Sequence, residues 1–474
     1  MSKFKSGVLS MFAALLGLLL STLPSFAGSQ VRIVRLSAVQ GHVQIDRATG
    51  QGFEKAFINL PITQGAQIRT GEDGFAEVEF EDASTLRIAP GTAVAFPQLA
   101  LDDAGSKLST VEVDHGIAYA NFAGTKKNQL TLTFAREHIA FAKPSHLRLE
   151  VVRDKAMVAV LAGEVQVAGA SGVVELEKKH SVVFDLMNQD QYKVAKNVEE
   201  GTYDAWDKQE DQIHQRDLQK TAVNNSPYSY GLADLNYYGS FMNLPGYGMM
   251  WQPYFTGAGW DPFMDGAWAW YPGMGYGWVS SYPWGWTPYH YGSWMFVSSY
   301  GWMWQPGGVW NGLGNMPLTA GAPQGFAPPR PPATAVHTLV TVNRGPVMAS
   351  PGMAASNKLV IRSGSAGIGI PRGSVQNLAK FSQQVQQHGS ATATVHTAPA
   401  PAMYGGARPM GGPAGYSRAT AAQSRGASPS QQGAAARQNS APAYHPSASA
   451  GSSSAGGGGM HSAASAPASS GARR

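Results

Sequence analysis

The chain of 474 residues contains no cysteine. This absence excludes disulfides, a thiol nucleophile, thiolate metal sites and a lipid-modified N-terminal cysteine. An exported domain built from this sequence must depend on its hydrophobic core for stability. That requirement fits a bacterial envelope protein better than a eukaryotic secreted one.

Acidic residues are missing from the C-terminal part of the chain. All 30 Asp and Glu lie at or before Asp265, whereas 12 Lys and Arg lie after it and none lies between Asp265 and Arg330. Residues 28–265 carry a net charge of −9, and residues 266–474 carry a net charge of +12. An acidic folded part joined to a basic tail can attract itself or an anionic polymer.

Long apolar runs are also scarce. Residues 8–20 are apolar, follow Lys3 and Lys5, and precede a small-x-small sequence at 25–27, which is the pattern of a secretory signal. The run is too short for a stable membrane anchor, and no later segment has about eighteen uninterrupted apolar residues. We expect residues 1–27 to be a signal peptide, and the mature protein to be exported to the periplasm or cell surface without a transmembrane segment.

Residues 31–190 alternate apolar and polar side chains in many short segments, such as 75–80 and 146–151. Alternation with a period of two is typical of strands with one buried and one wet face, so Glu77 and Glu79 are expected on a solvated face. Many short strands at regular spacing predict a mainly β fold for this part, as a roll or sandwich or as a solenoid.

Glycine precedes three of these alternating segments, at Gly41, Gly116 and Gly163. We expect each to supply a positive φ or a bulge where the chain turns a corner.

Three stretches of this region carry a family resemblance: Ala38–Val43, residues 65–88 with Gly65-Ala66-Gln67-Ile68-Arg69-Thr70-Gly71, and Val158–Val165. In order and spacing they resemble the FecR-type domain of bacterial envelope proteins, although that family usually has glycine where Ala83 stands. The resemblance implies a β-domain and a signalling role, because iron-regulatory FecR proteins transmit a receptor state across the inner membrane to a sigma factor. A chain without a transmembrane helix or a sigma-binding segment could sense only together with a membrane partner.

Residues 197–222 change to a polar stretch with sparse apolar positions. Glu199 and Glu200 stand early, and Arg216 and Lys220 stand late, which matches the helix dipole. The pattern predicts one connector helix.

Residues 228–312 concentrate aromatic side chains, with twelve Tyr, eleven Trp and four Phe between 228 and 310. A motif recurs about every twenty-six residues, in which Gly-x-Trp is followed after about nine residues by Tyr-Gly. Each copy fits two short strands joined by a Pro/Gly turn, and three copies would make a small antiparallel sheet or roll. We call residues 228–312 the aromatic module.

The rings of this module have two interpretations. They can form the core of a small domain that lacks aliphatic residues, or they can stack on sugar rings of a glycan. We favour a core for most of them, but eleven Trp exceed what some eighty residues can easily hide, and an exposed aromatic strip usually binds something. Trp260, Trp286 and Trp294 are the first candidates for exposure. The full set of candidate ligand-binding residues is Trp260, Trp286, Tyr289, Trp294 and Trp304.

The strings at residues 285–294 and 300–306 resemble an uncharacterised Trp/Tyr/Gly-rich domain that follows FecR-like domains in exported bacterial proteins. This second resemblance implies an architecture and no activity.

Residues 316–474 are dominated by Ala, Ser, Gly, Pro and Gln. Such a sequence buries too little apolar surface to offset its ordering entropy, so we expect a mostly disordered basic tail. Two patches have a local pattern, a strand at Lys358–Arg362 and a helix at Val375–His388. The charge density is low and argues against nucleic-acid binding, although weak attraction to an anionic envelope polymer fits it.

No motif of a nucleophile elbow, a phosphate loop or a zinc protease is present, so no enzyme activity is predicted. The histidines are scattered, which predicts no metal site, and no cofactor is expected; His290 should pack within the aromatic module. Asp261 and Asp265 are the only carboxylate pair near the Trp array, and a glycosidase role for them is not favoured.

These observations predict an exported, non-enzymatic envelope protein that binds or scaffolds, with the aromatic module as its contact surface for a polysaccharide, another envelope polymer or an envelope protein. The alternative is a FecR-type periplasmic sensing component that acts with a membrane partner.

Overall fold

The computed structural model describes residues 32–125, 127–170, 172–219, 231–345 and 358–395. They are found mainly in β-strands, so the predicted mainly β fold is confirmed. All of these described residues belong to one compact unit. The predicted signal segment and most of the predicted basic tail lie outside the described residues.

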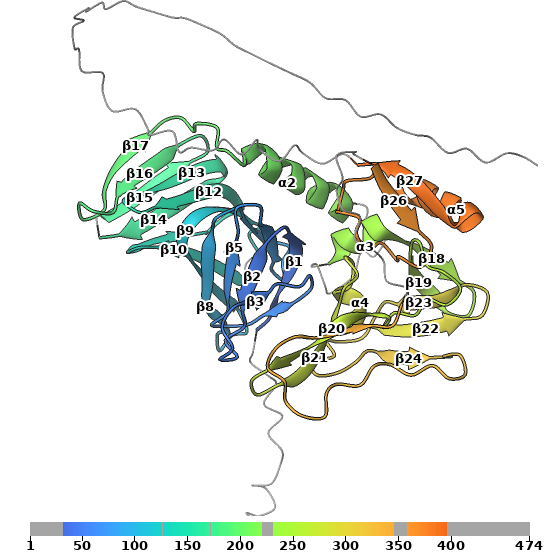
Figure 1. Ribbon diagram of the computed structural model, residues 1–474. Helices are drawn as coiled ribbons and strands as arrows, with labels where there is room; N and C mark the ends of the chain where they lie inside the picture. The colour runs from blue at the N-terminus through green and yellow to red at the C-terminus, as the bar shows by residue number, and fades with distance from the viewer. Residues whose placement is uncertain (1–31, 126, 171, 220–230, 346–357, 396–474) are drawn as a thin grey trace, which may run out of the picture. The chain divides into compact units, whose positions relative to one another are not determined.

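Residues 34–195 form a β-domain of two layers that share one apolar core (Figure 1). Layer A holds β1, β4, β6, β7, β12, β13, β16 and β17, and layer B holds β2, β3, β5, β8, β10, β11, β14 and β15. The strands are β1 (Val34–Gln40), β2 (Val43–Asp46), β3 (Glu54–Lys55), β4 (Pro61–Ile62), β5 (Gln67–Thr70), β6 (Phe75–Glu79), β7 (Thr85–Ile88), β8 (Ala93–Leu101), β9 (Lys107–Phe122), β10 (Asn128–Phe134), β11 (Glu137–Ala140), β12 (Ser145–Val152), β13 (Lys155–Ala162), β14 (Glu164–Gly169), β15 (Gly172–Glu177), β16 (Ser181–Asp185) and β17 (Gln191–Ala195).

The long strand β9 belongs to both layers. Its first half pairs with β8 and β10 in layer B, and its second half pairs with β7 and β12 in layer A. The change falls at Gly116, whose φ is 95° and where a Cβ would lie 2.3 Å from the Thr92 hydroxyl oxygen. Gly41 and Gly163 also have positive φ, at 66° and 75°. The prediction that these three glycines allow the chain to turn is therefore confirmed.

Two helices follow the β-domain: α2 (Asp204–Gln219) and α3 (Leu232–Tyr238). The acidic start and basic end predicted for the connector are present in α2 as Asp204, Asp207 and Arg216. Its buried face is largely polar, because Asp207, His214 and Asp217 are buried beside Ile213. None of the helices in the described ranges is both long and apolar enough to cross a membrane.

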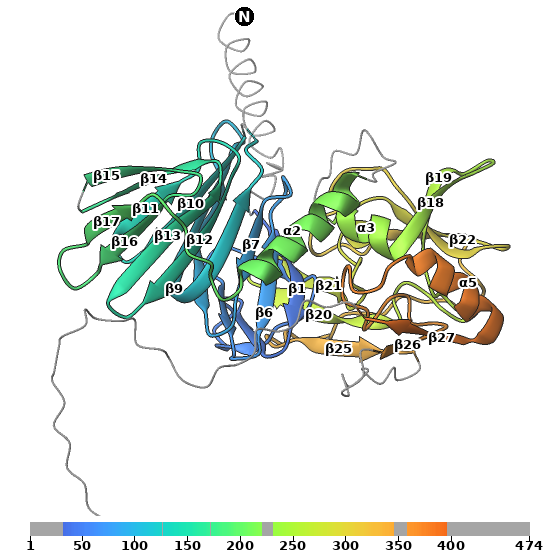
Figure 2. The same ribbon diagram turned by 90° about the horizontal axis from the view of Figure 1, so that it is seen from above.

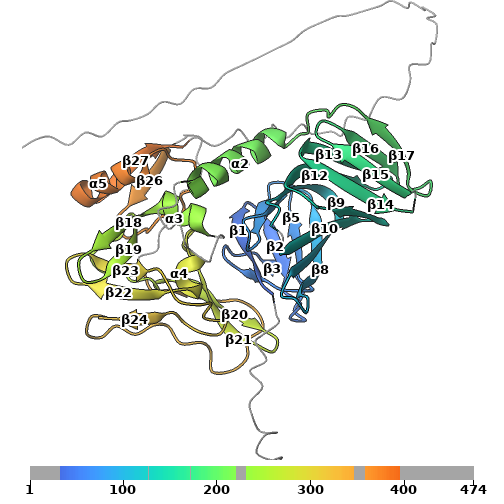
Figure 3. The same ribbon diagram turned by 180° about the vertical axis from the view of Figure 1, so that it is seen from behind.

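The aromatic module contains the three hairpins that the repeat predicts (Figure 3). They are β18–β19 (Gly239–Leu244 and Gly248–Pro253), β20–β21 (Asp265–Tyr271 and Gly275–Ser280) and β22–β23 (Ser293–Val297 and Gly301–Gln305), with the short helix α4 (Thr287–His290) before the third. Each hairpin has an aromatic cross-strand pair at the same position: Phe241 with Trp251, Trp268 with Trp278, and Trp294 with Trp304.

A glycine two residues before the first aromatic of each pair makes room for the second. A Cβ on Gly239 would lie 2.4 Å from the Trp251 ring, and one on Gly266 would lie 2.4 Å from the Trp278 ring. At Gly292 it would lie 2.7 Å from Nε1 of Trp304. The Gly-x-aromatic spacing of the repeat is therefore a packing requirement.

The first and third hairpins pack against each other through equivalent residues. They meet where Trp251 pairs with Trp304, and the side-chain amides of Gln252 and Gln305 donate to the carbonyl oxygens of Tyr300 and Tyr247. Their second core consists of residues fifty-three positions apart in the sequence: Leu244 and Val297, Met250 and Met303, with Met242 and Met295 packed against them.

The structure differs from the prediction of a disordered chain from residue 316 onward. In the described ranges 316–345 and 358–395, side chains such as Ile361, Leu378 and Val385 are buried in the same core as the Trp rings. The elements are β24 (Leu318–Ala320), β25 (Val340–Asn343), β26 (Lys358–Arg362), α5 (Leu378–His388) and β27 (Ser390–Thr394). The strand predicted at 358–362 is confirmed, and the helix begins three residues later than predicted. Composition misled here because the apolar residues are sparse but placed on one face.

The hairpin packing makes a testable prediction. Gly266→Ala should lower the free energy of unfolding by about 1–3 kcal/mol, because the new methyl group overlaps the Trp278 ring. Gly259→Ala is the matched control, since a Cβ at that position would have no atom within 4 Å and its φ is ordinary. Urea unfolding followed by Trp fluorescence measures both. Equal stability of the two variants would contradict this account of the repeat.

Candidate functional site

The five ring residues proposed as ligand contacts are all buried. Their exposed fractions are 5% for Trp260, 0% for Trp286, 1% for Tyr289, 0% for Trp294 and 2% for Trp304. The expectation that Trp260, Trp286 and Trp294 lie outside is therefore wrong. Ligand binding by the five rings stays a prediction, and it would require the module to open.

The rings are buried because they pack on one another and on chain segments from outside the module. The Trp284 ring lies at the centre, 5.0 Å from Trp251, 4.9 Å from Tyr282 and 5.8 Å from Trp294 between ring centroids. Residues 359–393 add further apolar cover, and Trp286 joins the core of the β-domain instead. The expectation of exposed Trp rings was wrong because it assumed that only residues of the module bury them.

His290 packs within the module, as expected. Its ring lies 4.3 Å from Trp286 and 4.6 Å from Trp310, and burial lowers its pKa to about 3. No group of three His, Cys, Asp or Glu suited to a metal ion occurs in the part of the chain that the structure describes.

The carboxylates near the Trp array are engaged in structural contacts. Asp261 pairs with Arg344 at 3.0 Å and caps the N–H of Phe263, and Asp265 accepts a hydrogen bond from Asn343. Burial raises the pKa of both carboxyl groups. These contacts give them a role in holding residues 343–344 against the second hairpin.

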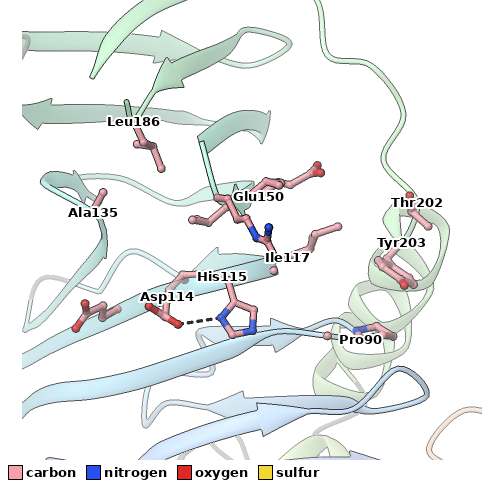
Figure 4. A pocket seen from close by; sticks show the side chains of 16 residues that line it. Pro90, Asp114, His115, Ile117, Ala135, Glu150, Leu186, Thr202 and Tyr203 are labelled. Atoms are coloured by element: carbon pink, nitrogen blue, oxygen red, sulfur yellow. Dashed lines mark hydrogen bonds and ion pairs between the residues drawn. The ribbon is translucent and has the colours of Figure 1, made fainter. Parts of the chain in front are cut away.

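A hollow of about 860 Å³ opens in the β-domain, which we call the groove (Figure 4). It lies beside the corner of β9 and extends to the residues just before α2. Its lining is formed by Pro90, Gly91, Glu112, Val113, Asp114, His115, Gly116, Ile117, Ala135, Glu150, Val151, Val152, Arg153, Leu186, Thr202 and Tyr203.

The lining of the groove includes several charged side chains. Asp114 pairs with the His115 ring at 2.8 Å, and both side chains are exposed. Glu112, Glu150 and Arg153 also line it, and none of the three has an ion pair among the described residues. Sequence reasoning missed this site because its lining comes from six separate segments. The glycine that bends β9 was the only local signal.

A network of buried charges surrounds α2, the helix that follows the groove residues Thr202 and Tyr203. Arg87 pairs with Glu77 and with Asp207 of α2, each at 2.9 Å, and Arg372 pairs with Glu77 at 2.7 Å. Arg372 also reaches Asp234 of α3 at 3.3 Å. We call Arg35, Glu77, Glu79, Arg87, Asp207, Asp234 and Arg372 the junction network.

Its other end joins β1, β6 and α3. Arg35 pairs with Glu79 at 2.7 Å and also with Asp234, and Glu79 accepts a hydrogen bond from the backbone N–H of Gly231 at 3.2 Å. The side chains of Arg35 and Glu79 have no exposed surface. The expectation that Glu77 and Glu79 lie on a solvated face is therefore wrong. Alternation in β6 was read correctly, but both of its faces are covered.

Burial shifts the titration of this network. Desolvation raises the pKa of Glu79 to about 7, aided by the Asp234 and Glu77 carboxylates and opposed by Arg35. The pKa of Glu77 is well below its usual value, because Arg372 and Arg87 outweigh the cost of burial. His214 of α2, beside Arg372, Glu77 and Arg87, has its pKa lowered to about 4, mainly by burial.

Further polar contacts join the β-domain to the aromatic module. Arg47 donates to the carbonyl oxygens of Trp270 and His337, each at 2.7 Å. The side-chain amide of Asn59 donates to the carbonyl oxygens of Ser280 and Tyr282. Tyr271 and Trp286 of the module also lie within the β-domain core. The two regions are thus packed together through both apolar and polar contacts.

The buried histidines predict acid sensitivity with a defined sign. A histidine whose folded pKa is depressed contributes stability above the unfolded value of about 6.5 that is lost as the pH falls towards the folded pKa. For His214, with a folded pKa of about 4, the loss between pH 7 and 5 should be about 2 kcal/mol.

His214→Gln should therefore lose about 2 kcal/mol less stability than the wild type over this range. The measurement is the free energy of unfolding in urea at several pH values. His290 should produce a similar loss in both proteins. An identical pH dependence for variant and wild type would show that His214 is not held neutral by burial.

Comparison with known proteins supports the two resemblances. Residues 66–166 match the family model "FecR protein", and residues 232–328 match a family of unknown function, DUF6600. None of the curated proteins matches the chain.

Two crystal structures of a candidate anti-sigma factor from Parabacteroides distasonis, at 1.65 and 2.50 Å resolution, are similar to part of the chain. They are 16% and 15% identical, with TM-scores of 0.26 and 0.25. The matches cover 30% and 28% of this chain and 63% and 59% of those structures, so the chain spans less than two thirds of their length. The chain thus contains one region similar to the FecR family, residues 66–166, and a second region that matches DUF6600, residues 232–328.

Proposed function

We propose that the protein is an exported, non-enzymatic sensing component of the bacterial envelope that binds a partner in the groove of its FecR-like domain. The observation that carries this proposal is the continuity of groove, α2 and junction network. A ligand in the groove would touch residues that lead directly into the network.

The path begins at Thr202 and Tyr203, which line the groove and immediately precede α2. The next residue, Asp204, pairs with Arg148 and accepts a hydrogen bond from the Tyr119 hydroxyl at 2.8 Å. One turn later, Asp207 pairs with Arg87 of the junction network. Displacement of Tyr203 by a partner would therefore strain two ion pairs, one partly buried at Asp204 and one buried at Asp207.

The network then reaches the DUF6600 domain. Asp234 lies in α3, at the start of the residues that match this family, and it pairs with both Arg35 and Arg372. Because a buried ion pair that loses one partner costs about 3–5 kcal/mol, movement of α2 is coupled to the placement of this second domain. We propose that binding at one domain changes the position of the other through this coupling.

A binding role agrees with the chemistry present. The described residues hold no metal-type cluster, and the Asp261 and Asp265 carboxylates are engaged by Arg344 and Asn343. Export and an envelope location are proposed from the N-terminal sequence and from the FecR likeness. Like the FecR proteins of the first resemblance, the chain would need a membrane or envelope partner to pass a signal on.

The aromatic module takes a structural role in this proposal. Most of its rings are interior packing, whereas Tyr247 and Tyr300 are exposed. A polysaccharide would have to bind at the surface or open the module. Such binding remains the second candidate role, and a fluorescence titration with cell-wall polysaccharide would test it.

The proposed function predicts a groove-dependent partner. A photo-crosslinking residue in place of Thr202 should capture an envelope protein in intact bacteria, and Glu150→Lys in the groove wall should abolish the adduct. Lys55→Glu, an exposed charge change on β3, is the control and should leave it unchanged. A chain that fractionates with the cytosol, or an adduct that survives Glu150→Lys, would overturn the proposal.

A further inference from the structure

The last strand of the β-domain has one free edge. β17 (Gln191–Ala195) pairs with β16 on one side, and no backbone partner on its other side is found among the described residues. Figures 1 and 3 both show it as the outermost strand of layer A. All but the last of its residues are exposed. Its outward N–H and C=O groups are therefore open to pairing with another strand.

Apolar side chains of β17 extend past the core. Tyr192 is opposite Phe184 and Val194 is opposite Val182, so these pairs point to the same face of the layer. Phe184 and Val182 are fully buried, whereas Tyr192 and Val194 are 40% and 42% exposed. Seen from above in Figure 2, β15 and β17 lie at the same outer end of the domain. The core-facing side of β17 thus has an incomplete cover.

Four lysines lie on β17 or beside its C-terminal end. Lys178 and Lys179 lie in the turn before β16, and the pairing of Ser181 with Ala195 brings that turn beside Lys196. Lys193 lies within β17 itself. All four are exposed, and none has an ion pair with a described residue. They form a basic cluster on a part of the chain whose net charge is −9.

The nearby acidic residues make no ion pair with these lysines among the described residues, and Glu199 and Glu200 follow Lys196 by three and four positions. Asp185 is at the opposite end of the strand pair, where its carboxylate accepts hydrogen bonds from the Met187 N–H and the Asn188 side chain. Asp190 is buried and paired with Arg136 at 2.8 Å. Glu177, at the end of β15, is the carboxylate that adjoins Lys178 in sequence.

We infer that the outer edge of β17 is a docking site for an extended, acidic segment of a partner protein, which adds to layer A as a further strand. Main-chain hydrogen bonds to the free edge would hold the segment. Its alternate side chains would cover Tyr192 and Val194, and its carboxylates would pair with Lys193 and Lys196.

A second copy of the same chain fits this edge less well. Antiparallel pairing of β17 with itself about its centre would place Lys193 opposite Lys193 of the other copy, and like charges directly opposite are destabilising. A lysine on an edge strand is also a common guard against aggregation. That role would explain Lys193, but it does not require the three lysines outside the strand or the exposed Tyr192.

The site is separate from the groove and from the family match. No residue of β17 lines the groove, and the FecR match ends at residue 166, before β16 and β17 begin. The inference therefore goes beyond the proposed function and can fail independently of it.

The test uses the full chain and two synthetic ten-residue peptides. One peptide alternates valine with glutamate, and the other has lysine in place of each glutamate. We expect the acidic peptide to bind at least tenfold more tightly than the basic one, with an affinity that falls as salt is added. Hydrogen exchange should slow in residues 191–195.

Lys193→Glu combined with Lys196→Glu should weaken binding of the acidic peptide at least tenfold. Lys55→Glu combined with Lys208→Glu is the control, because it reverses two exposed charges elsewhere, and it should bind as the wild type does. The inference is overturned by equal affinity for the two peptides, by no binding, by binding that survives the first double variant, or by protection outside β17. Self-association of the chain through β17 would assign the edge to a second copy and overturn it as well.

Discussion

The arrangement of this protein depends on a set of charges removed from water. Arg35, Arg87 and Arg372 lie buried among the carboxylates of Glu77, Glu79, Asp207 and Asp234. Buried ion pairs add little stability compared with apolar side chains of the same size, but removal of one member leaves an uncompensated charge. Such a network therefore selects one arrangement of the chain more than it stabilises it. Only one arrangement pairs every charge, and it fixes the relative positions of β1, β6, β7, α2, α3 and the segment around residue 372.

Packing between distant segments likewise gives the aromatic module a structural role. A set of rings this large could have been a binding surface, but most of the rings are buried by one another, by the FecR-like domain and by residues 358–395. Trp286, Tyr271 and Leu313 lie in the core of the FecR-like domain. The two family matches therefore describe parts that are linked by shared packing as well as by charges. Under the proposed function, this shared packing would carry a displacement at the groove to the second domain, because a shift of either part would uncover a buried charge or ring.

The sequence predicts the local structure well. Alternation predicts the strands of residues 31–190, glycine positions predict the corners at Gly41, Gly116 and Gly163, and the repeat predicts three hairpins. These features depend on neighbours close in the chain. Local patterns do not contain burial by distant segments. Alternation alone predicts a solvent-exposed Glu79, but Arg35 and α3 cover this side chain. Ring number alone predicts an exposed Trp294, but residues 359–393 pack on the array of rings. The sequence does not predict the groove for the same reason, because its lining residues come from separate turns and strand ends.

We infer that the FecR-like and DUF6600 domains form one cooperative structure held by the junction network. This cooperativity can be measured by native-state hydrogen exchange of the full chain at increasing urea. We expect the core amides of β12 and β13 and those of β20 and β21 to open with the same free energy and the same urea dependence. Replacement of Arg35 by Met should lower both free energies together. Opening of β20 and β21 at a lower free energy than β12 and β13, without a response to that replacement, would contradict the account.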